Sequence, residues 1–522
     1  MCTEIWRQTL SDLLRRTAAR TPHKQAVHCG ATVWTYAQFD QICTQLAAGL
    51  VQHEIRAGDH VAILARNSHA FAAMRFAVAR VGAVLVPINF MLQAHEVAYI
   101  LRHASVRFLC VDSGLAALGR QAAALDTPVE QLIWLPSEDA SEPVAGVLGF
   151  DELLQAGIDS TQSFAQITSQ SLAQIVYTSG TESQPKGAML THEAVIAEYV
   201  SCLVDAEISD ADVTLHALPL YHCAQLDVFL GPCVYVGATN VITSTPTPEN
   251  LLPLMERHGI TSFFAPPTIW ISLLRSPLFE RYELSGLRKG YYGASIMPVE
   301  VLKEIQQRLP QVRLWNLYGQ TEIAPVATVL KPQDQVRKAG SAGRPTLNVE
   351  TRVIDDSGRQ VAPGEIGEIV HRSPQLMRGY YRDEERTQAA FHGGWFHSGD
   401  LATIDEEGYI TVVDRKKDMI KTGGENVSSR EVEEVIYRLG AVSEVAVIGL
   451  PDAKWIEAVT AVIVLKSGCA LSEAAVIEHC NALLATFKAP KRVIFASNLP
   501  KNPSGKLLKR ELRKLYAGDS NT

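Results

Sequence analysis

The sequence lacks any uninterrupted apolar stretch long enough to span a bilayer, although 47% of its 522 residues are hydrophobic. A transmembrane helix needs about 20 consecutive, predominantly apolar residues, so we expect no integral membrane segment. The first residues, Met-Cys-Thr-Glu-Ile-Trp-Arg-Gln, also lack the basic and then apolar profile of a signal peptide. We therefore expect a cytoplasmic protein.

The sequence has no excess of basic residues and no obvious metal-binding cysteines. Its 48 lysines and arginines are outnumbered by 56 aspartates and glutamates, which gives a net charge of -8. Nucleic-acid-binding proteins usually have a basic surface, so we expect no nucleic-acid partner. The nine cysteines are scattered, without a Cys-x-x-Cys pair or a histidine spacing typical of zinc sites. Free thiols in a reducing compartment are the simpler interpretation.

The length and the pattern of apolar residues predict an α/β fold with more than one domain. A chain of 522 residues is too long for one hydrophobic core. Val61–Ala65 and Ala83–Ile88 are short apolar strand candidates, and the amphipathic run Ala70–Val81 lies between them, as in a parallel sheet with helical crossovers. Beyond residue 340, short alternating segments such as Glu350–Ile354, separated by glycine and proline, predict a small β subdomain.

The C-terminal part predicts a separate, small α+β domain. The charged segment Asp414–Asp418 has the composition of a domain boundary. After it, Ser428 and Glu431 have the spacing of a helix capping box. A second helix is expected to begin at Ser472. Its predicted apolar stripe consists of Val476, Cys480, Leu483, Leu484 and Phe487.

One loop combines residue types that suit the binding of a phosphate group. Residues 177–187, Tyr-Thr-Ser-Gly-Thr-Glu-Ser-Gln-Pro-Lys-Gly, follow the apolar run Leu172–Val176 and precede a helix-like run from Glu193. The predicted order is strand, tight loop and helix, in which backbone N–H groups and a helix N-terminus can surround an anion. Because Lys186 is followed by glycine and not by a hydroxyl residue, the loop differs from the common nucleotide-binding loop. A Ser/Thr-rich surface turn is the alternative.

Six other loops carry glycine, hydroxyl, aromatic, carboxylate or lysine residues, and the first three of them follow apolar runs. The carboxyl ends of parallel strands meet along one edge of a sheet, so we expect the first three of these loops to lie near Lys186. In chain order, the loops are Pro219–His222, Tyr292–Ser295, Trp315–Glu322, Gly394–Asp400, Lys421–Asn426 and Leu499–Lys506.

Together, these motifs closely resemble, in order and separation, those of the adenylate-forming superfamily of acyl-CoA synthetases, peptide synthetase adenylation domains and beetle luciferases. The resemblance covers nearly the whole chain and points most closely to bacterial fatty-acyl-CoA synthetases. It implies a ligase that joins a carboxylate to the α-phosphate of ATP, expels pyrophosphate and then passes the acyl group to a thiol. The implied cofactors are ATP, Mg²⁺ and coenzyme A, and the implied substrate is a small carboxylic acid.

The resemblance also implies roles for individual residues. The residues expected at the β and γ phosphates are Thr178, Ser179, Gly180, Thr181 and Lys186. Those expected at the adenine and its surroundings are Gly293, Ala294, Ser295, Tyr318, Gly319 and Thr321. The remaining assignments are Asp400 at the ribose hydroxyls, Arg415 in support of it, Glu322 and Thr181 at Mg²⁺, and Lys506 at the forming adenylate. In isolation, Asp400 is more often a turn former and Arg415 a solvated surface charge.

The resemblance further implies that the small domain rotates between two half reactions. Lys417 matches the hinge position, where a few backbone torsions can absorb a large rotation. The rotation would withdraw Lys506 and bring in the loop of Lys421, Gly423 and Gly424, whose glycines allow a pantetheine arm to pass close to the backbone. The expected domains are therefore residues 1–414, a hinge at 415–417, and a mobile lid at 418–522.

Two neighbouring residues narrow the choice of acid. His222 matches a position that, in relatives, lines the acyl tunnel, although a lone histidine beside an apolar run is more often a core residue. Cys223 stands where amino-acid-activating relatives have an aspartate, and a thiol cannot pair with an ammonium group. An acid without an α-amine is favoured, and an aliphatic one over an aryl one. We expect the segment Val228–Gly237 and the neighbourhood of Tyr291 and Tyr292 to set the depth of the tunnel.

Two alternatives to a CoA ligase stay open at this stage. The acyl group could be transferred to the phosphopantetheine of an acyl carrier protein, or the chain could be a non-catalytic nucleotide-binding relative. The chain also departs from the family pattern. Glu182 and Ser183 replace a threonine and a glycine of the phosphate loop, and a carboxylate beside polyphosphate is unfavourable unless it points away or helps to hold magnesium. Tyr292 and Ile456 each replace a glycine.

Overall fold

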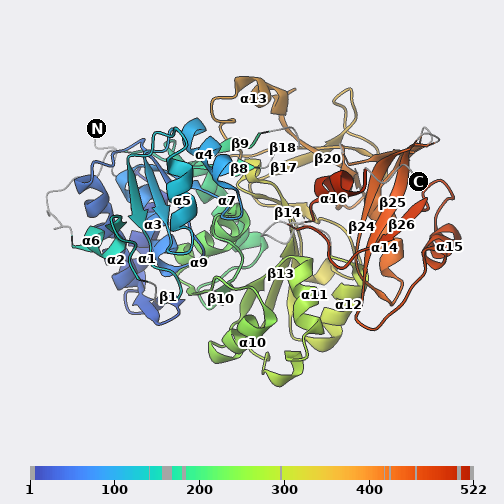
Figure 1. The fold of residues 1–522 in the computed structure, drawn as a ribbon, viewed down its shortest axis with the longest axis horizontal. Helices are drawn as coiled ribbons and strands as arrows, with labels where there is room; N and C mark the ends of the chain where they lie inside the picture. Colours follow the sequence, from blue (N-terminus) through green and yellow to red (C-terminus); the bar gives the residue numbers. More distant parts are fainter. Residues whose placement is uncertain are drawn as a thin grey trace.

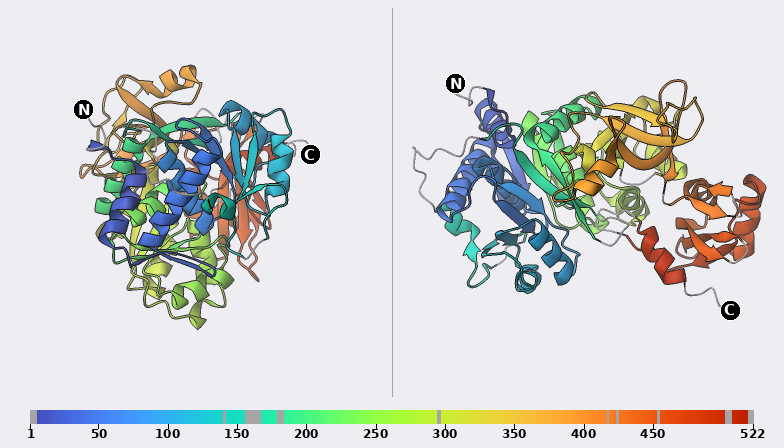
Figure 2. Two further views of the ribbon diagram at one scale, coloured as in Figure 1. Left: turned by 90° about the vertical axis from the view of Figure 1, so that its left-hand side faces the viewer. Right: turned by 90° about the horizontal axis from the view of Figure 1, so that it is seen from above.

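The computed structural model describes residues 6–139, 142–155, 167–178, 184–293, 297–416, 418–422, 425–452, 455–501 and 507–517. These residues form a large N-terminal lobe and a smaller, β-rich C-terminal lobe, which lie side by side in Figure 1 and in the right panel of Figure 2. The described residues contain four β-sheets, three in the large lobe and one in the small lobe. The predicted α/β class, with a large lobe and a small C-terminal lobe, is confirmed.

The first sheet of the large lobe has seven strands, and the predicted phosphate loop connects the two strands at one of its edges. Its inner strands are parallel to one another, and two of them, β4 and β5, are completely apolar, as expected for strands covered by helices on both faces. In spatial order, the strands are β7 (Leu148–Gly149), β6 (Gln131–Trp134), β5 (Phe108–Val111), β3 (His60–Leu64), β4 (Val84–Pro87), β8 (Leu172–Thr178) and β9 (Lys186–Thr191).

The second sheet has nine strands and contributes two of the loops that form the candidate site. Its six central strands are parallel, and antiparallel strands lie at both ends. In spatial order, the strands are β16 (Arg344–Pro345), β15 (Val326–Leu330), β14 (Arg313–Gly319), β13 (Lys289–Gly293), β12 (Ser262–Phe264), β10 (Val213–His216), β11 (Thr239–Ile242), β1 (Gln25–Cys29) and β2 (Thr32–Thr35).

Helices cover these two sheets and bury the core between them. Phe39 and Phe76 pack edge to face within the largest apolar cluster, where α2 and α3 meet the strands. The longer helices of the large lobe are α1 (Leu10–Arg20), α2 (Tyr36–Gln52), α3 (His69–Val81), α4 (Ala94–His103), α5 (Ala116–Ala123), α7 (His192–Asp205), α10 (Pro248–Arg257), α11 (Pro267–Arg275), α12 (Val299–Arg308) and α13 (Glu384–Ala390). The shorter ones are α6 (Phe150–Leu154), α8 (Cys223–Gln225), the π-helical turn η2 (Leu226–Leu230), α9 (Gly231–Val236), and the 3₁₀ turns η3 (Phe279–Arg281), η4 (Thr321–Ile323) and η5 (Pro332–Asp334).

Two five-stranded sheets complete the fold, of which the third is antiparallel and the fourth is mixed, because its β26 runs parallel to β25. The third sheet is the predicted small β subdomain, and the fourth forms the C-terminal lobe. The third sheet contains β17 (Glu350–Ile354), β18 (Gly367–Arg372), β19 (Phe391–His392), β20 (Trp395–Ile404) and β21 (Ile410–Arg415). The fourth contains β22 (Ile420–Thr422), β23 (Glu425–Val427), β24 (Val442–Asp452), β25 (Ile456–Leu465) and β26 (Arg492–Phe495), with helices α14 (Ser429–Tyr437), α15 (Glu473–Leu483) and α16 (Lys509–Tyr516).

The predicted phosphate loop is part of a β-hairpin, so the predicted order of strand, loop and helix is wrong. Strand β9 begins at Lys186 and pairs antiparallel with β8, with Thr178 opposite Lys186. Helix α7 starts only at His192, where the Thr191 hydroxyl accepts a hydrogen bond from the Ala194 N–H. The N-terminus of the helix is therefore separated from the loop by a whole strand. The sequence did not predict strand β9, because the alternation of apolar and other residues within residues 186–191 is short.

The predicted helices of the small lobe are present, with two differences. The Ser428 hydroxyl accepts a hydrogen bond from the Glu431 N–H at 3.3 Å, but the Glu431 carboxylate binds Lys488 at 2.7 Å, so only half of the predicted capping box forms. Helix α15 is capped by Ser472 and ends at Leu483, whose side chain is 49% exposed. The predicted apolar stripe is therefore shorter than expected.

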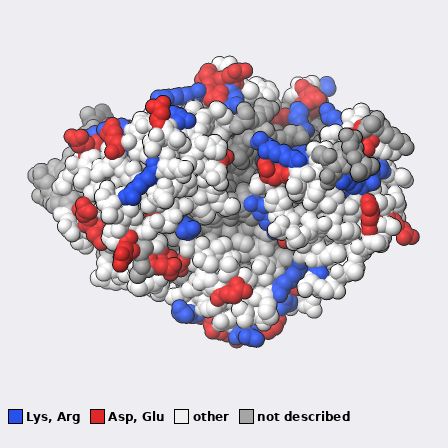
Figure 3. All heavy atoms as spheres, in the orientation of Figure 1, with Lys and Arg blue, Asp and Glu red and all other residues white. Residues whose placement is uncertain are grey.

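The lobes contact each other through α11, where Arg275 Nη1 donates to the Ser443 hydroxyl of β24 at 2.6 Å. Within the described ranges, no helix combines the length and apolar character that crossing a membrane requires. On the face drawn in Figure 3, acidic and basic side chains are interspersed, and neither sign dominates.

Candidate active site

A lysine, a tyrosine and a glutamate meet beside the β8–β9 hairpin. Lys186 is the first residue of β9, and its ammonium group lies 3.5 Å from Glu322 Oε1 and hydrogen-bonds to the Tyr380 hydroxyl. The Tyr380 hydroxyl in turn donates to Glu322 Oε1 at 2.8 Å. Glu322 lies in η4, directly after β14. Three segments far apart in the sequence thus converge on one carboxylate.

Tyr380 reaches this position because residues 378–381 run alongside β9. Tyr380 forms an antiparallel bridge with Ala188, and the Tyr381 N–H donates to the Gly187 carbonyl at 2.8 Å. Burial and the adjacent Glu322 carboxylate raise the pKa of Tyr380, so the phenol keeps its proton. The sequence prediction missed Tyr380. In the sequence, Gly379-Tyr380 resembles the other glycine-containing separators between the short strands of the predicted β subdomain.

A second cluster forms around the Asp400 carboxylate. The Tyr318 hydroxyl donates to Asp400 Oδ2 at 2.7 Å, and Arg415 Nε lies 3.2 Å from Asp400 Oδ1. Asp400 and Arg415 are direct neighbours in the pairing of β20 with β21, and Tyr318 belongs to β14. Asp400 is only 6% exposed. Of the three side chains predicted at the ribose and the adenine, Tyr318 and Arg415 therefore both bind the third, Asp400.

Burial and neighbouring charges shift the pKa values of two side chains in this cluster. Burial, followed by the Asp400 charge, raises the pKa of Tyr318. Burial alone would lower the pKa of Arg415, but the negative charges of Asp400 and Asp418 outweigh it and raise the pKa above its ordinary value. A fixed carboxylate between a phenol and a guanidinium can still accept hydrogen bonds from a ligand, because each of its oxygens has two lone pairs.

Two glycines end the neighbouring strands β13 and β14. A Cβ atom at Gly319 would lie 1.9 Å from the Pro325 carbonyl oxygen, and one at Gly293 would lie 2.5 Å from the Leu317 carbonyl oxygen. Contacts below about 3 Å exclude any side chain at both positions. The immediate reason for glycine here is therefore close packing of backbone against backbone, whatever contact a ligand makes in addition.

His222 and Cys223 lie at the start of α8, where Cys223 contacts η4. His222 caps α8, and its Nδ1 accepts a hydrogen bond from the Ala224 N–H at 3.1 Å, which places the proton of a neutral imidazole on Nε2. The Cys223 sulfur lies 3.3 Å from the Thr321 hydroxyl, one residue before Glu322. Burial raises the pKa of Cys223, so the residue is a neutral thiol.

Two more predicted residues have described positions at the ends of strands. Thr178 ends β8, and its buried hydroxyl oxygen has no hydrogen-bond partner within the part of the chain that the structure describes. Lys421 belongs to β22, and its N–H donates to Glu457 Oε2 at 2.6 Å. The predicted residues outside the described ranges are Ser179, Gly180, Thr181, Glu182, Ser183, Ala294, Ser295, Lys417, Gly423, Gly424 and Lys506.

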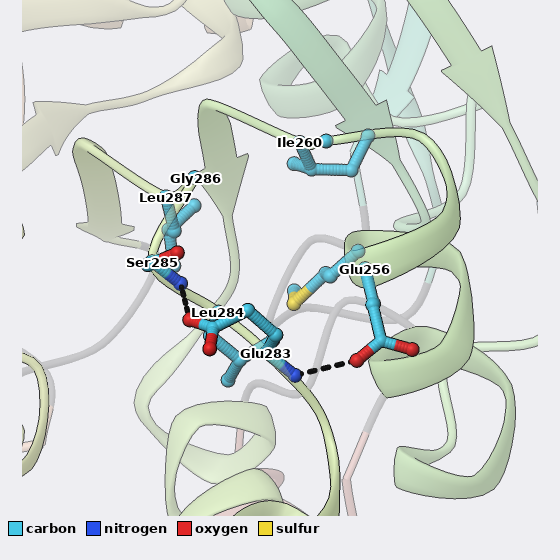
Figure 4. Close-up of a pocket in the computed structure, with 9 residues that line it drawn as sticks. Glu256, Ile260, Glu283, Leu284, Ser285, Gly286 and Leu287 are labelled. Atoms are coloured by element: carbon cyan, nitrogen blue, oxygen red, sulfur yellow. Dashed lines mark hydrogen bonds between the residues drawn. The ribbon is translucent and has the colours of Figure 1, made fainter.

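A surface pocket elsewhere in the molecule contains none of the predicted residues. It has a volume of about 190 Å³ and lies between the end of α10 and the loop before β13 (Figure 4). The Glu283 N–H donates to Glu256 at 2.7 Å, and the Ser285 N–H donates to Glu283 at 2.9 Å, so these two backbone N–H groups already have protein partners. The converging side chains of the large lobe are the better candidate site.

Comparison with known proteins gives consistent matches over nearly the whole length. Residues 14–381 match the family model described as AMP-binding enzyme, and residues 431–506 match that of the AMP-binding enzyme C-terminal domain. A feruloyl-CoA synthase from Amycolatopsis sp. is 35% identical, covering 96% of this chain and 98% of its own. The long-chain-fatty-acid–CoA ligase FadD13 from Mycobacterium tuberculosis is 34% identical, covering 97% and 98%. The crystal structure of the anthranilate CoA ligase AuaEII in complex with anthranoyl-AMP has a TM-score of 0.91 at 27% identity, covering 99% of this chain and 98% of that chain.

Proposed function

The chain belongs to the AMP-binding enzyme family and is an adenylate-forming acyl-CoA synthetase, and from that premise we propose which residues perform each half reaction and which acid the enzyme takes. The observation that supports the assignment is that one short segment, residues 318–322, contributes a side chain to each of the two clusters. Tyr318 at the end of β14 binds Asp400, and Glu322, four residues later, binds Lys186 and Tyr380. Groups suited to the two ends of one nucleotide are thus fixed relative to each other.

In the proposed first half reaction, a carboxylate oxygen of the acid attacks the α-phosphorus of ATP. The bond from that phosphorus to the bridging oxygen breaks, and pyrophosphate leaves. Lys186, whose side chain is 27% exposed, can turn its ammonium group toward the departing phosphates. Thr178, Ser179, Gly180 and Thr181 are proposed to hold the β and γ phosphates together with Lys186. Lys506 is proposed to stabilise the charge that develops at the α-phosphate.

Glu322 is the residue proposed to hold Mg²⁺. No group of three or more histidine, cysteine, aspartate or glutamate side chains suited to a metal occurs within the described ranges. Mg²⁺ is commonly bound by only one or two carboxylates together with the phosphates of a substrate, and a buried carboxylate beside the phosphate-binding lysine fits that pattern. When bound, Mg²⁺ would neutralise phosphate charge. Thr181 is proposed as its second protein ligand.

The Asp400 cluster is proposed to bind the nucleoside. Its carboxylate would accept hydrogen bonds from the ribose hydroxyls, while Arg415 fixes its orientation. Tyr318 presents its ring at the end of β14, next to Gly293 at the end of β13, where the adenine would lie. Ala294, Ser295, Gly319 and Thr321 are proposed to complete that slot.

In the proposed second half reaction, the thiol sulfur of CoA attacks the acyl carbon of the adenylate. The bond from that carbon to the AMP oxygen breaks, and AMP leaves. We propose that the lobes move about a hinge at residues 415–417, between a large domain of residues 1–414 and a lid of residues 418–522. The motion would bring Lys421, Gly423 and Gly424 to the site. Arg415, which binds Asp400 at 3.2 Å, is the first residue of this proposed hinge.

The proposed substrate is an acid without an α-amine, and we favour an aliphatic acyl group. Cys223 supports this because its neutral, buried thiol provides no negative charge for an α-ammonium group. The names of the relatives include both feruloyl-CoA and long-chain fatty-acid ligases, so family membership alone does not select the acid. We also propose a cytoplasmic location, which the eight free cysteines of the described residues support.

A panel of acids tests this assignment. The enzyme is incubated with ATP, Mg²⁺ and acids of varied length, branching and ring content, with and without CoA, and pyrophosphate, AMP and thioester are measured. We expect AMP and thioester to form with CoA and without any carrier protein. Thioester formation only with a phosphopantetheinylated carrier protein would contradict the choice of CoA. The strongest signal with α-amino acids would contradict the assignment of Cys223.

A further inference from the structure

Helix α7 contains a glutamate that the proposed mechanism does not use. Glu198 is completely buried, at 0% exposure. Its Oε1 accepts a hydrogen bond from the Cys202 thiol one turn later, at 3.0 Å. Its Oε2 has no partner within the described ranges. A buried carboxyl oxygen without a partner is costly, typically about 1–3 kcal/mol, so it calls for an explanation.

The nearest strong charges do not serve as partners for Glu198. Arg75 pairs with Asp227 at 3.0 Å, and both side chains are at most 2% exposed. Asp227 also accepts a hydrogen bond from Gln174 at 2.7 Å. Burial, and then the negative charge of Asp227, raises the pKa of Glu198 well above its ordinary value. Glu198 is therefore a neutral carboxylic acid with one hydrogen-bonding position unused.

Helix α7, which contains Glu198, packs against elements of the candidate site. The hydroxyl of Tyr199, the next residue of α7, donates to Asp227 Oδ1 of η2 at 3.4 Å, and η2 directly follows α8, which begins at Cys223. Helix α7 is also linked to η4 through Gln375. Ser201 of α7 donates to Gln375 at 2.7 Å, and Gln375 donates to the Ile323 carbonyl at 3.3 Å. Glu198 thus belongs to a helix that contacts η2 directly and supports η4 through Gln375.

An apolar cluster lies beside Glu198. Its partner Cys202 belongs to an apolar cluster with Val228 and Phe229. In that cluster, Phe229 packs against Tyr291 with ring centroids 5.0 Å apart, and Tyr291 stacks on Trp315 at 5.1 Å. Val228 and Tyr291 are in the region expected to set the depth of the acyl tunnel. The π-helical turn η2, a form frequent at functional sites, directs Asp227 into the same interior.

We infer that Glu198 is the hydrogen-bonding end of the acyl pocket, and that the acid has a second polar group, a hydroxyl, carbonyl or amide, at the end remote from its carboxylate. Ligand pockets are mostly apolar with a few polar groups that fix orientation, and a pocket built to hydrogen-bond a substrate strongly rejects the analogue that lacks the partner. This inference rests on the proposed function and specifies its substrate class.

The test compares pairs of acids of equal chain length, ω-hydroxyalkanoic and plain alkanoic, by kcat/KM for thioester formation. We expect the wild type to prefer the hydroxy acid, and Glu198→Leu to reduce kcat/KM for the hydroxy acid by at least about tenfold while plain acids are unaffected or improved. Glu198→Gln, which keeps the shape and can still hydrogen-bond, should retain the preference. Glu193→Gln, at an exposed position of the same helix, is the matched control.

The outcomes separate this inference from the proposed function. A wild-type preference for plain acids throughout the series would overturn the inference even if Glu198→Leu fails to fold. An unchanged ratio of the two acids in folded Glu198→Leu would also overturn it and would leave Glu198 as a packing residue. Absence of thioester with every acid would overturn the proposed function and this inference with it.

Discussion

Asp400 and Arg415 face each other across the β20–β21 pair, with Arg415 Nε 3.2 Å from Asp400 Oδ1. Arg415 is also the last residue of β21, where the chain leaves the large lobe. A ligand that binds Asp400 therefore contacts the carboxylate that anchors the start of the proposed hinge. This relationship links nucleotide binding to the position of the small lobe through one ion pair.

Replacing Asp400 by asparagine should weaken ATP binding more than it changes the fold. The amide keeps the volume but loses the charge that pairs with Arg415, and hydrogen bonds to charged groups contribute about 1.5–3 kcal/mol. We expect KM for ATP to rise by roughly tenfold to a hundredfold in acid-dependent pyrophosphate release. Asp210→Asn, at an exposed position in the loop before β10, is the control. An equal rise in KM in both variants would contradict the role of Asp400.

Tyr380→Phe tests the tyrosine that bridges Lys186 and Glu322. The phenylalanine keeps the ring but removes the hydroxyl that donates to Glu322 at 2.8 Å. A water molecule can take over part of the hydrogen bonding of the lost hydroxyl. We therefore expect the rate of pyrophosphate release to fall by about tenfold, which is less than the fall expected for Lys186→Met. Tyr381→Phe, the neighbouring residue, should have wild-type rates. If Tyr380→Phe also has wild-type rates, the hydroxyl does not contribute to the first half reaction.

Lys506→Ala should separate the two half reactions. A cation placed at developing charge typically contributes about 10²–10³-fold, so we expect a loss of that size in adenylate formation. Thioester formation from a supplied acyl adenylate should change much less. Lys501→Ala is the control in the same segment, because Lys501 is already paired with Glu444 at 2.7 Å. A parallel loss of both half reactions in Lys506→Ala would show that the assignment of Lys506 is wrong.

The raised pKa of Glu198 predicts a pH-dependent difference in stability. In the unfolded chain this carboxyl ionises near its ordinary pKa of 4.5, whereas burial keeps it protonated in the fold. The stabilising contribution is therefore complete below pH 4.5 and is lost as the pH rises toward the folded pKa. Glu198→Gln cannot ionise, so its free energy of unfolding should increase relative to wild type between pH 4.5 and neutrality. Urea titrations over that range measure the difference, and Glu193→Gln should show none. A constant difference would mean that Glu198 is ionised in the fold.

Segments with a strong local pattern were predictable from the sequence. Helix α3 begins within one residue of the prediction, and β17 has the predicted bounds. Both are specified by apolar periodicity and by flanking turn residues, which are local properties. The resemblance of the ordered motifs was enough to identify the family.

The contacts that complete the site were not predictable in the same way. Lys186 and Tyr380 are 194 positions apart, and they meet only because residues 378–381 align with β9. The hairpin of β8 and β9 depends on pairing across the loop, which residue types alone did not reveal. The burial of Glu198 is equally non-local, because it results from the packing of α7 against η2.

The most direct test of the central claim is a single-turnover experiment with labelled ATP, in which CoA is added only after the first products have been measured. The account predicts that acid and ATP give pyrophosphate and an enzyme-bound acyl adenylate without CoA, and that added CoA then converts this adenylate into thioester and AMP. Release of ADP and phosphate, or thioester formation without any preceding adenylate, would contradict it.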